Sequence, residues 1–195
     1  MKIIGLTGGI GMGKSTTATA LRRAGFPVFD ADAAVRRMQS PGGLALPAIA
    51  AAFPGTVTAG SLDRAALRAA VTQDPSARRR LERIVHPLVR DQERRFLAAA
   101  RRARARAAVL DIPLLLETNG QRRCDLVVVV SAPRRVQIAR VLRRGIMTLP
   151  QVEAFIRAQM PDAEKRRRAD VVIRTGLSRF HALRRIRRLI QDLLA

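Results

Sequence analysis

Aromatic residues and cysteine are scarce in this sequence. Its 195 residues include no tryptophan, no tyrosine, six phenylalanines and one cysteine. The lone cysteine, Cys124, cannot form a disulfide within the chain or build a cysteine-based metal site, which is typical of a protein of the reducing cytoplasm. The shortage of aromatic rings leaves few platforms on which nucleic-acid bases could stack.

Long apolar runs are absent as well. No run approaches the roughly 20 residues needed to span a bilayer, and the N-terminal stretch MKIIGLTGG has no small-residue cleavage site of the kind that ends a signal peptide. Apolar residues still make up 48% of the chain, enough for a substantial core. We therefore expect a single globular domain, located in the cytoplasm, with no membrane partner.

Acidic residues are greatly outnumbered. Asp and Glu total 15 against 37 Lys and Arg, which gives a formal net charge of +22, and Lys2, Lys14 and Lys165 are the only lysines. Abundant alanine beside arginine indicates GC-rich coding and ordinary solvated surfaces; a nucleic-acid-binding surface is the alternative. The positive field would also attract a polyanionic small ligand. Because stacking rings are few, we expect no specific nucleic-acid partner.

Apolar periodicity predicts strands that alternate with helices. The expected strands are residues 2–7, 26–32, 107–117, 124–133 and 171–176. Helices are expected at 14–24 and after the later strands, and the last helix is predicted to carry Phe180, Leu183, Ile186 and Ile190 on one apolar face. This alternation predicts an α/β fold with a parallel sheet sandwiched by helices.

The stretch from Ala33 to about Arg106 contains no convincing strand. A helix is expected to begin near Ser61 or Asp63, either of which could serve as its N-cap. A long basic helix is expected to start at His86, with the following proline in its first turn. We therefore expect a helical insertion in the α/β domain.

The stretch GGIGMGKS at residues 8–15 matches the pattern G-x-x-x-x-G-K-[ST] and lies between an expected strand and an expected helix. Its glycines let the backbone wrap so that N–H groups face phosphate oxygens, and the helix N-terminus favours the same anion. Lys14 is suited to the β- and γ-phosphates, the Ser15 hydroxyl to Mg²⁺, and the Thr16 hydroxyl to a phosphate. The residues predicted to bind a nucleoside triphosphate are Gly8, Gly9, Gly11, Met12, Gly13, Lys14, Ser15 and Thr16.

Two aspartates lie at the carboxyl end of the second expected strand. The carboxyl ends of parallel strands gather around the ligand crevice of an open α/β sheet, so Asp30 and Asp32 are predicted to lie near the γ-phosphate. A carboxylate there orients an acceptor hydroxyl and takes its proton, which is the role we predict for Asp32. Asp30 is predicted to act on Mg²⁺ only indirectly, as a partner of the groups that surround the ion. The alternative is that one aspartate caps the helix that begins near Ala33.

Five segments of the chain share their order and spacing with one family. They are IGLTGGIGMGKSTTA followed by GFPVFDAD, RRRLERIVHPLV (78–89), VLDIPLLLE (109–117), VQIARVLRR (136–144) and FIRAQMPDAEKRRRADVVI (155–173). With these segments the chain resembles the dephospho-CoA kinases. The resemblance implies transfer of the γ-phosphate of ATP to the ribose 3′-hydroxyl of dephospho-CoA, the last step of coenzyme A biosynthesis, with ATP and Mg²⁺ as cofactors. It also implies a core of residues 1–32, 107–143 and 169–195, a helical CoA-binding lobe of residues 33–106 and a lid of residues 144–168.

The same resemblance assigns roles to individual residues. Gly11 through Thr16 match the family's ATP-binding loop, and Asp32 matches the carboxylate that acts as catalytic base. Arg140 and Arg144 match two arginines at the entrance to the lid, where a planar guanidinium group can grip phosphate oxygens. Asp111, as in other P-loop sheets, is predicted to hold a water of the Mg²⁺ shell; the alternative is that it only caps a helix after the strand.

The turn after the last expected strand departs from the family pattern. It reads VVIRTGLS, so Arg174 and Thr175 replace the usual Asp-Asn turn and alter the contacts expected for adenine. The departure does not touch the phosphate loop or Asp32, so activity is expected to survive. Two other functions remain open: a P-loop kinase of another small hydroxyl substrate, such as a nucleoside or nucleotide, and a basic ATP-dependent nucleic-acid-binding protein.

Overall fold

The computed structural model describes residues 1–194, with all of their side chains except those of Gln73, Pro75 and Arg179. The chain divides into two compact units. One consists of Met1–Phe29 together with the chain from Ala100 onward, and the other consists of Asp30–Ala99. Within residues 1–194, no helix combines the length and the apolar character that crossing a bilayer requires.

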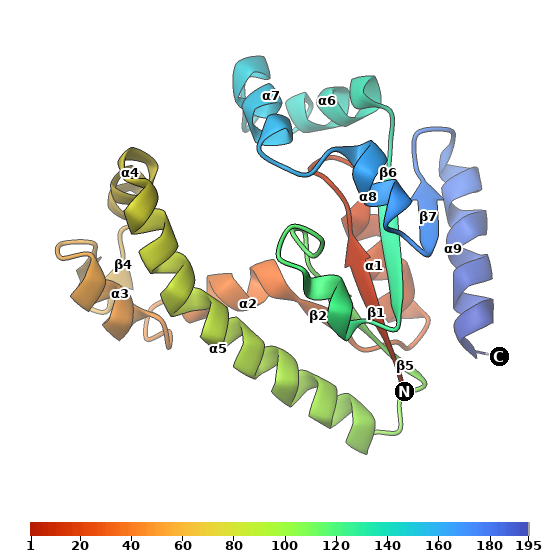
Figure 1. Ribbon diagram of the computed structural model, residues 1–195, viewed down its shortest axis with the longest axis horizontal. Helices are drawn as coiled ribbons and strands as arrows, with labels where there is room; N and C mark the ends of the chain where they lie inside the picture. The colour runs from red at the N-terminus through yellow and green to blue at the C-terminus, as the bar shows by residue number, and fades with distance from the viewer. Residues whose placement is uncertain (195) are drawn as a thin grey trace. The chain divides into compact units, whose positions relative to one another are not determined.

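A five-stranded sheet is the centre of the first unit. Its order is β2-β5-β1-β6-β7 (Figure 1), and β1 runs parallel to both β5 and β6, as β6 does to β7. The strands are β1 (Lys2–Thr7), β2 (Val28–Asp30), β5 (Ala107–Asp111), β6 (Leu126–Ser131) and β7 (Val171–Arg174). The predicted parallel α/β sheet is therefore confirmed, with β1 in its middle.

Side chains of β6 alternate between two apolar layers. Val128 and Val130 belong to a core cluster that includes residues of α1 (Lys14–Arg23) and α9 (Arg179–Leu194), whereas Val127 and Val129 cluster with Leu115 and Leu116. Successive side chains of a strand point to opposite faces, so a strand apolar at every position needs cover on both faces. The remaining helices of this unit are α6 (Arg134–Leu142), α7 (Leu149–Arg157), α8 (Asp162–Arg167) and the 3₁₀ turn η1 (Gly120–Arg123).

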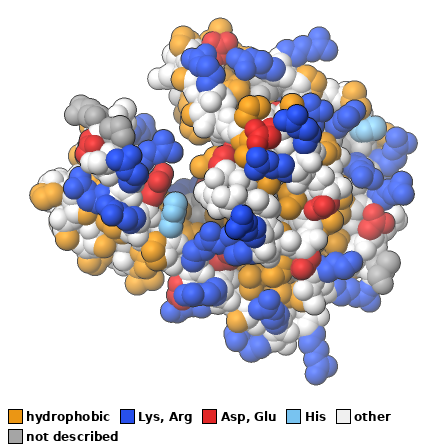
Figure 2. Space-filling view, viewed as in Figure 1, with side chains coloured by type: hydrophobic (Ala, Val, Ile, Leu, Met, Phe, Trp, Pro, Cys, Tyr) orange, Lys and Arg blue, Asp and Glu red, His pale blue; other side chains and the backbone are white. Residues whose placement is uncertain are grey.

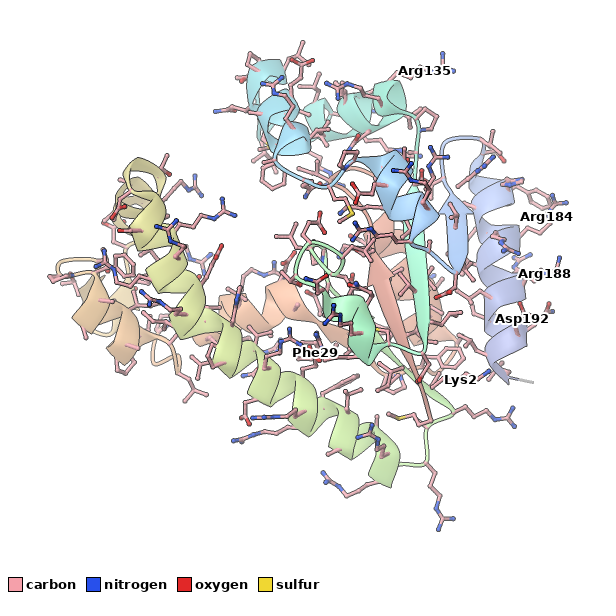
Figure 3. The ribbon with its side chains drawn as sticks, viewed as in Figure 1. Lys2, Phe29, Arg135, Arg184, Arg188 and Asp192 are labelled. Carbon is pink, nitrogen blue, oxygen red and sulfur yellow. The ribbon has the colours of Figure 1, made fainter. Side chains whose placement is uncertain are left out.

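Helix α9 buries most of the predicted face, because Leu183, Ile186 and Ile190 pack in or against the core, but the prediction is wrong for Phe180. Phe180 is 69% exposed, while Ile186 and Leu189 are buried. Residues six positions apart differ by about 240° around an α-helix, so Phe180 cannot share the face of Ile186. Arg184 and Arg188 extend outward from the helix (Figure 3).

The second unit is mostly helical and has its own apolar core. Its buried core residues are Met38, Ala45, Ile49, Phe53, Leu67 and Ala77. Its helices are α2 (Ala31–Met38), α3 (Leu46–Ala52), α4 (Arg64–Gln73) and most of α5 (Pro75–Arg102). The prediction that this stretch contains no strand is wrong, because β3 (Val57–Thr58) and β4 (Ser61–Leu62) form an antiparallel pair. Strands of two residues are too short to show a period.

The long helix α5 begins earlier than predicted. It starts at Pro75 instead of His86, so Pro87 lies inside the helix instead of in its first turn. Asp74 stabilises the beginning of the helix at this point, because its carboxylate accepts hydrogen bonds of 2.7 Å from the backbone N–H and the hydroxyl of Ser76. These bonds hold the pKa of Asp74 below its usual value. A proline at the first helical position is favourable, and the sequence offers that signal at Pro75 as well as at Pro87.

Candidate active site

The glycine-rich turn between β1 and α1 is tightly packed. Gly11 and Gly13 adopt left-handed φ angles of 72° and 94°. A Cβ at Gly11 would lie 2.8 Å from the carbonyl oxygen of Gln137, so a side chain there would clash with backbone. Gly13 is the N-cap of α1 and has no side chain to satisfy the first helical N–H groups. The sequence predicts that an anion binds at N–H groups of this kind, and the structure gives them no side-chain cap.

Lys14 forms an ion pair with Asp111. Asp111 lies at the carboxyl end of β5, opposite Leu6 in the parallel register, which brings it beside the end of β1. The side chain of Asp111 is only 5% exposed and that of Lys14 is 17% exposed. A carboxylate buried this deeply needs a cation, and Lys14 supplies it. The structure thus brings together two of the predicted site residues, one from the start of α1 and one from the end of β5.

Oxygen donors suited to a divalent cation lie in the same part of this unit. Ser15 and Thr16 are exposed in the first turn of α1, and Asp111 contributes a carboxylate. Mg²⁺ prefers hard oxygen ligands and keeps several waters, so a hydroxyl and a carboxylate fit it without a larger set of protein ligands. Within the described residues there is no group of three or more His, Cys, Asp or Glu that could hold a metal by itself.

Arg140 contacts the glycine-rich turn through Thr175. Its Nη1 lies 2.9 Å from the Thr175 hydroxyl, and its Nη2 lies 2.7 Å from the Thr175 carbonyl oxygen. Arg140 also lines a groove of about 460 Å³ along α6, together with Arg135, Val136, Ala139 and Arg143. Arg144, the second predicted arginine, is exposed after the end of α6. The structure therefore connects Arg140, but not Arg144, to the turn by contacts among the described residues.

Two glutamines that sequence reasoning missed hold Ile10 of the turn. The Gln137 amide donates to the Ile10 carbonyl oxygen at 2.9 Å, and the Ile10 N–H donates to the Gln159 side chain at 3.4 Å. Gln137 is buried in α6, and Gln159 follows α7. Amide side chains have no periodic signal, so only the folded contacts single them out.

Sequence reasoning also missed a buried ion pair, in which Glu117 of the segment after β5 pairs with Lys165 of α8. The Lys165 ammonium group is 2.7 Å from a Glu117 oxygen that also accepts from the Met160 N–H at 3.1 Å. Lys165 donates at 3.4 Å to the carbonyl oxygen of Pro113, which also accepts from the Thr7 hydroxyl. One signal could have found it: Lys165 is one of three lysines in a chain whose other basic residues are arginine.

Asp30 and Asp32 belong to the second unit and differ in their surroundings. The strand ends at Asp30, so Asp32 lies in the first turn of α2 and not in an extended segment as predicted. Asp30 is the N-cap of α2, with its carboxylate accepting from the Ala33 N–H at 2.8 Å. Asp32 is exposed. The capping alternative therefore applies to Asp30 and leaves the Asp32 carboxylate available.

Comparisons with known proteins identify similar chains along almost the whole length. One family model, described as dephospho-CoA kinase, matches residues 2–178. A dephospho-CoA kinase of Gluconobacter oxydans is 54% identical over 197 residues, which cover 99% of this chain and 98% of the relative. One of Paramagnetospirillum magneticum is 60% identical over 166 residues, covering 85% of this chain and 78% of the relative.

A solved structure shows the same fold. The crystal structure of TT1252 from Thermus thermophilus aligns with a TM-score of 0.86 and 37% sequence identity, covering 100% of this chain and 98% of the other. The similarity therefore includes the glycine-rich turn, the end of β5 and the helices around the sheet.

Proposed function

The chain belongs to the dephospho-CoA kinase family, and from this premise we propose that it transfers the γ-phosphate of ATP to the ribose 3′-hydroxyl of dephospho-CoA. The products are coenzyme A and ADP. The observation that carries this function is the family match over residues 2–178, which includes the glycine-rich turn and its Lys14–Asp111 pair.

The triphosphate binds at the turn between β1 and α1. The left-handed glycines and the absence of a side-chain cap at the start of α1 support this location, because a helix N-terminus after such a turn favours an anion. Lys14 neutralises the β- and γ-phosphate oxygens. The residues proposed to bind ATP are Gly8, Gly9, Gly11, Met12, Gly13, Lys14, Ser15 and Thr16.

Ser15 would hold Mg²⁺ through its hydroxyl, and Asp111 would hold a water of the same shell. When bound, the ion supplies neutralising charge to the β- and γ-phosphate oxygens. The ion pair with Lys14 fixes the Asp111 carboxylate at the end of β5. The chain's own contribution is thus to position one hydroxyl and one carboxylate.

Asp32 is the proposed catalytic base. As the ribose 3′-oxygen bonds to the γ-phosphorus and the bond from that phosphorus to the bridging oxygen of ADP breaks, the 3′-hydroxyl proton passes to the Asp32 carboxylate. The exposure of Asp32 supports this role, since its neighbour Asp30 is already occupied in capping α2. Arg140 and Arg144 would stabilise the charge that spreads over the transferred phosphoryl group.

In this proposal the chain has three functional parts. The core comprises residues 1–32, 107–143 and 169–195, the CoA-binding lobe comprises residues 33–106, and the lid comprises residues 144–168. A lid that closes over ATP excludes water, which would otherwise accept the phosphoryl group. We place the enzyme in the cytoplasm, in keeping with its single cysteine.

A coupled ADP-release assay tests this function. The protein is supplied with ATP, Mg²⁺ and one of three acceptors: dephospho-CoA, adenosine or AMP. We expect dephospho-CoA to be preferred by about a hundredfold or more in kcat/KM, because a site built for a large polar substrate loses most of its contacts with a fragment. Equal use of AMP or adenosine would identify a kinase of another hydroxyl substrate. No transfer to dephospho-CoA would overturn the proposal.

A further inference from the structure

Thr175 lies at the start of the turn between β7 and α9. Its backbone N–H donates to the Ser131 carbonyl oxygen at 2.8 Å, which continues the parallel pairing of Ser131 with Arg174 at the end of β6 and β7. The side chain is half-buried. The sheet therefore fixes the backbone of Thr175, and its side chain lies at the carboxyl edge where the glycine-rich turn follows β1.

The Thr175 hydroxyl joins two groups of the candidate site. It donates to the Met12 carbonyl oxygen at 2.7 Å and accepts from Arg140 Nη1 at 2.9 Å. A hydroxyl has one proton and two lone pairs, so it makes both bonds at once. The Thr175 methyl group also packs against the turn, because a Cβ built on Gly13 would lie 3.3 Å from it.

Thr175 also fixes the orientation of the Arg140 guanidinium group. The Thr175 carbonyl oxygen accepts from Nη2 at 2.7 Å, so a single residue binds both terminal nitrogens of Arg140. A third contact of 3.4 Å joins Nη1 to the Gly11 carbonyl oxygen. Guanidinium has five N–H donors, so these three contacts leave others for phosphate oxygens. Because these contacts already fix the planar guanidinium group, Arg140 loses little additional side-chain entropy when it binds an anion.

From these contacts we infer that Thr175 is a positioning residue for phosphoryl transfer, acting through Arg140 and the backbone of the glycine-rich turn. The inference rests on the proposed function, in which both groups contact ATP. The prediction that the departure at residues 174–175 does not touch the phosphate loop is wrong, because the Thr175 hydroxyl bonds to Met12 of that loop. Thr175 carries a short hydroxyl where the family pattern has the longer amide of asparagine. Through that hydroxyl three separate segments are in contact: the turn after β1, helix α6 and the turn after β7.

Thr175→Val tests the hydroxyl, since valine has nearly the same shape. The variant leaves the Met12 carbonyl oxygen and one Arg140 N–H without their partner, so kcat should fall about tenfold or more. The KM for ATP should change by less than about threefold, because Lys14 and the glycines remain. Thr175→Ser, which keeps the hydroxyl, should retain a kcat close to that of the wild type. Thr118→Val, at an exposed threonine whose hydroxyl bonds within its own turn, is the matched control and should have no effect.

A double-mutant cycle with Arg140→Ala separates positioning from general destabilisation. If Thr175 acts through Arg140, Thr175→Val should lower kcat in the Arg140→Ala background by much less than in the wild type. Thr175→Ala gives the same comparison should the valine variant fail to fold, which thermal melting will show. Equal losses in both backgrounds, a serine variant as slow as the valine variant, or a valine variant with wild-type kcat would each overturn the inference. Wild-type protein that fails to phosphorylate dephospho-CoA would instead refute the proposed function.

Discussion

Lys14 and Asp111 form the central charge pair of the candidate site. They are 97 positions apart in the chain, and the parallel pairing of β1 with β5 brings them together. A buried carboxylate beside a triphosphate would repel it, so in the proposed function the positive charge of Lys14 would have two tasks: to compensate Asp111 and to attract the phosphates. The two tasks can be separated by mutation.

Lys14→Met should lower kcat/KM for ATP by about a hundredfold or more and should also destabilise the fold, because Asp111 is left buried without its cation. In the double variant Lys14→Met, Asp111→Asn, stability should recover while activity stays low. Steady-state kinetics and thermal melting measure the two effects. Lys2→Met, at an exposed lysine that begins β1, is the control. Wild-type kinetics in Lys14→Met would show that the glycine-rich turn does not hold the triphosphate.

Asp32→Asn tests the proposed base. The amide cannot take the proton of the acceptor hydroxyl, so kcat should fall about a hundredfold or more while the Kd for ATP stays within about twofold. Single-turnover kinetics and ATP titration measure the two quantities. Asp192→Asn, at an exposed aspartate of α9 (Figure 3), serves as the control and should behave like the wild type. An Asp32→Asn enzyme that turns over at the wild-type rate would exclude Asp32 as the base.

At the scale of elements, an ion pair and hydrogen bonds hold the segment that follows β5 against α8. Glu117 accepts from both Lys165 and the Met160 N–H, and the Pro113 carbonyl oxygen accepts from Lys165 and from Thr7 at the end of β1. The side chain of Lys165 is only 2% exposed. These contacts fix the end of the proposed lid to the strand that precedes the glycine-rich turn.

Lys165→Met should lower the free energy of unfolding by about 3–5 kcal/mol, because it leaves the Glu117 carboxylate uncompensated. Adding Glu117→Gln should restore much of that loss. The control is Arg78→Met, which removes an exposed pair with Glu82 and should cost no more than about 1 kcal/mol. Urea unfolding gives the three values. A Lys165→Met variant as stable as the wild type would mean that the buried pair contributes no net stability.

The bounds of some helices and strands were predicted more accurately from the sequence than those of others. The strands β1 and β6 carry continuous apolar runs beside clear turn signals, and both were predicted within a few residues. The start of α5 was missed because proline signals a helix start at both Pro75 and Pro87, and Asp74 decides between them by bonding to Ser76. The pair β3–β4 is held by tertiary packing and has no sequence pattern of its own.

At the scale of the whole molecule, the main electrostatic feature is a large excess of positive charge. The chain carries a formal net charge of +22, and basic side chains are spread over the visible face between apolar and acidic ones (Figure 2). On this face the basic side chains do not gather into a single patch. Both proposed substrates are polyanions, so the net field should still assist their binding.

Raising the KCl concentration from about 0.05 M to about 0.5 M should raise the KM for ATP several-fold and change kcat little, because screening shortens the reach of the net charge from more than 10 Å to a few ångströms. Initial rates at fixed Mg²⁺ measure both constants. A gel shift with double-stranded DNA in moderate salt is the companion experiment, and we expect no tight binding. A KM that does not respond to salt would contradict steering by the net charge.

The sequence by itself determined the parallel α/β fold and the glycine-rich turn that we propose to bind phosphate, because strand periodicity and the requirement for glycine at crowded backbone positions are local properties. It also placed Asp32 as the candidate base, a role that still awaits its test. Only the tertiary structure decided the partners: Asp111 for Lys14, Glu117 for Lys165, and Met12 with Arg140 for Thr175. These contacts join segments between 35 and 163 positions apart, and their geometry depends on which strands are neighbours in the sheet.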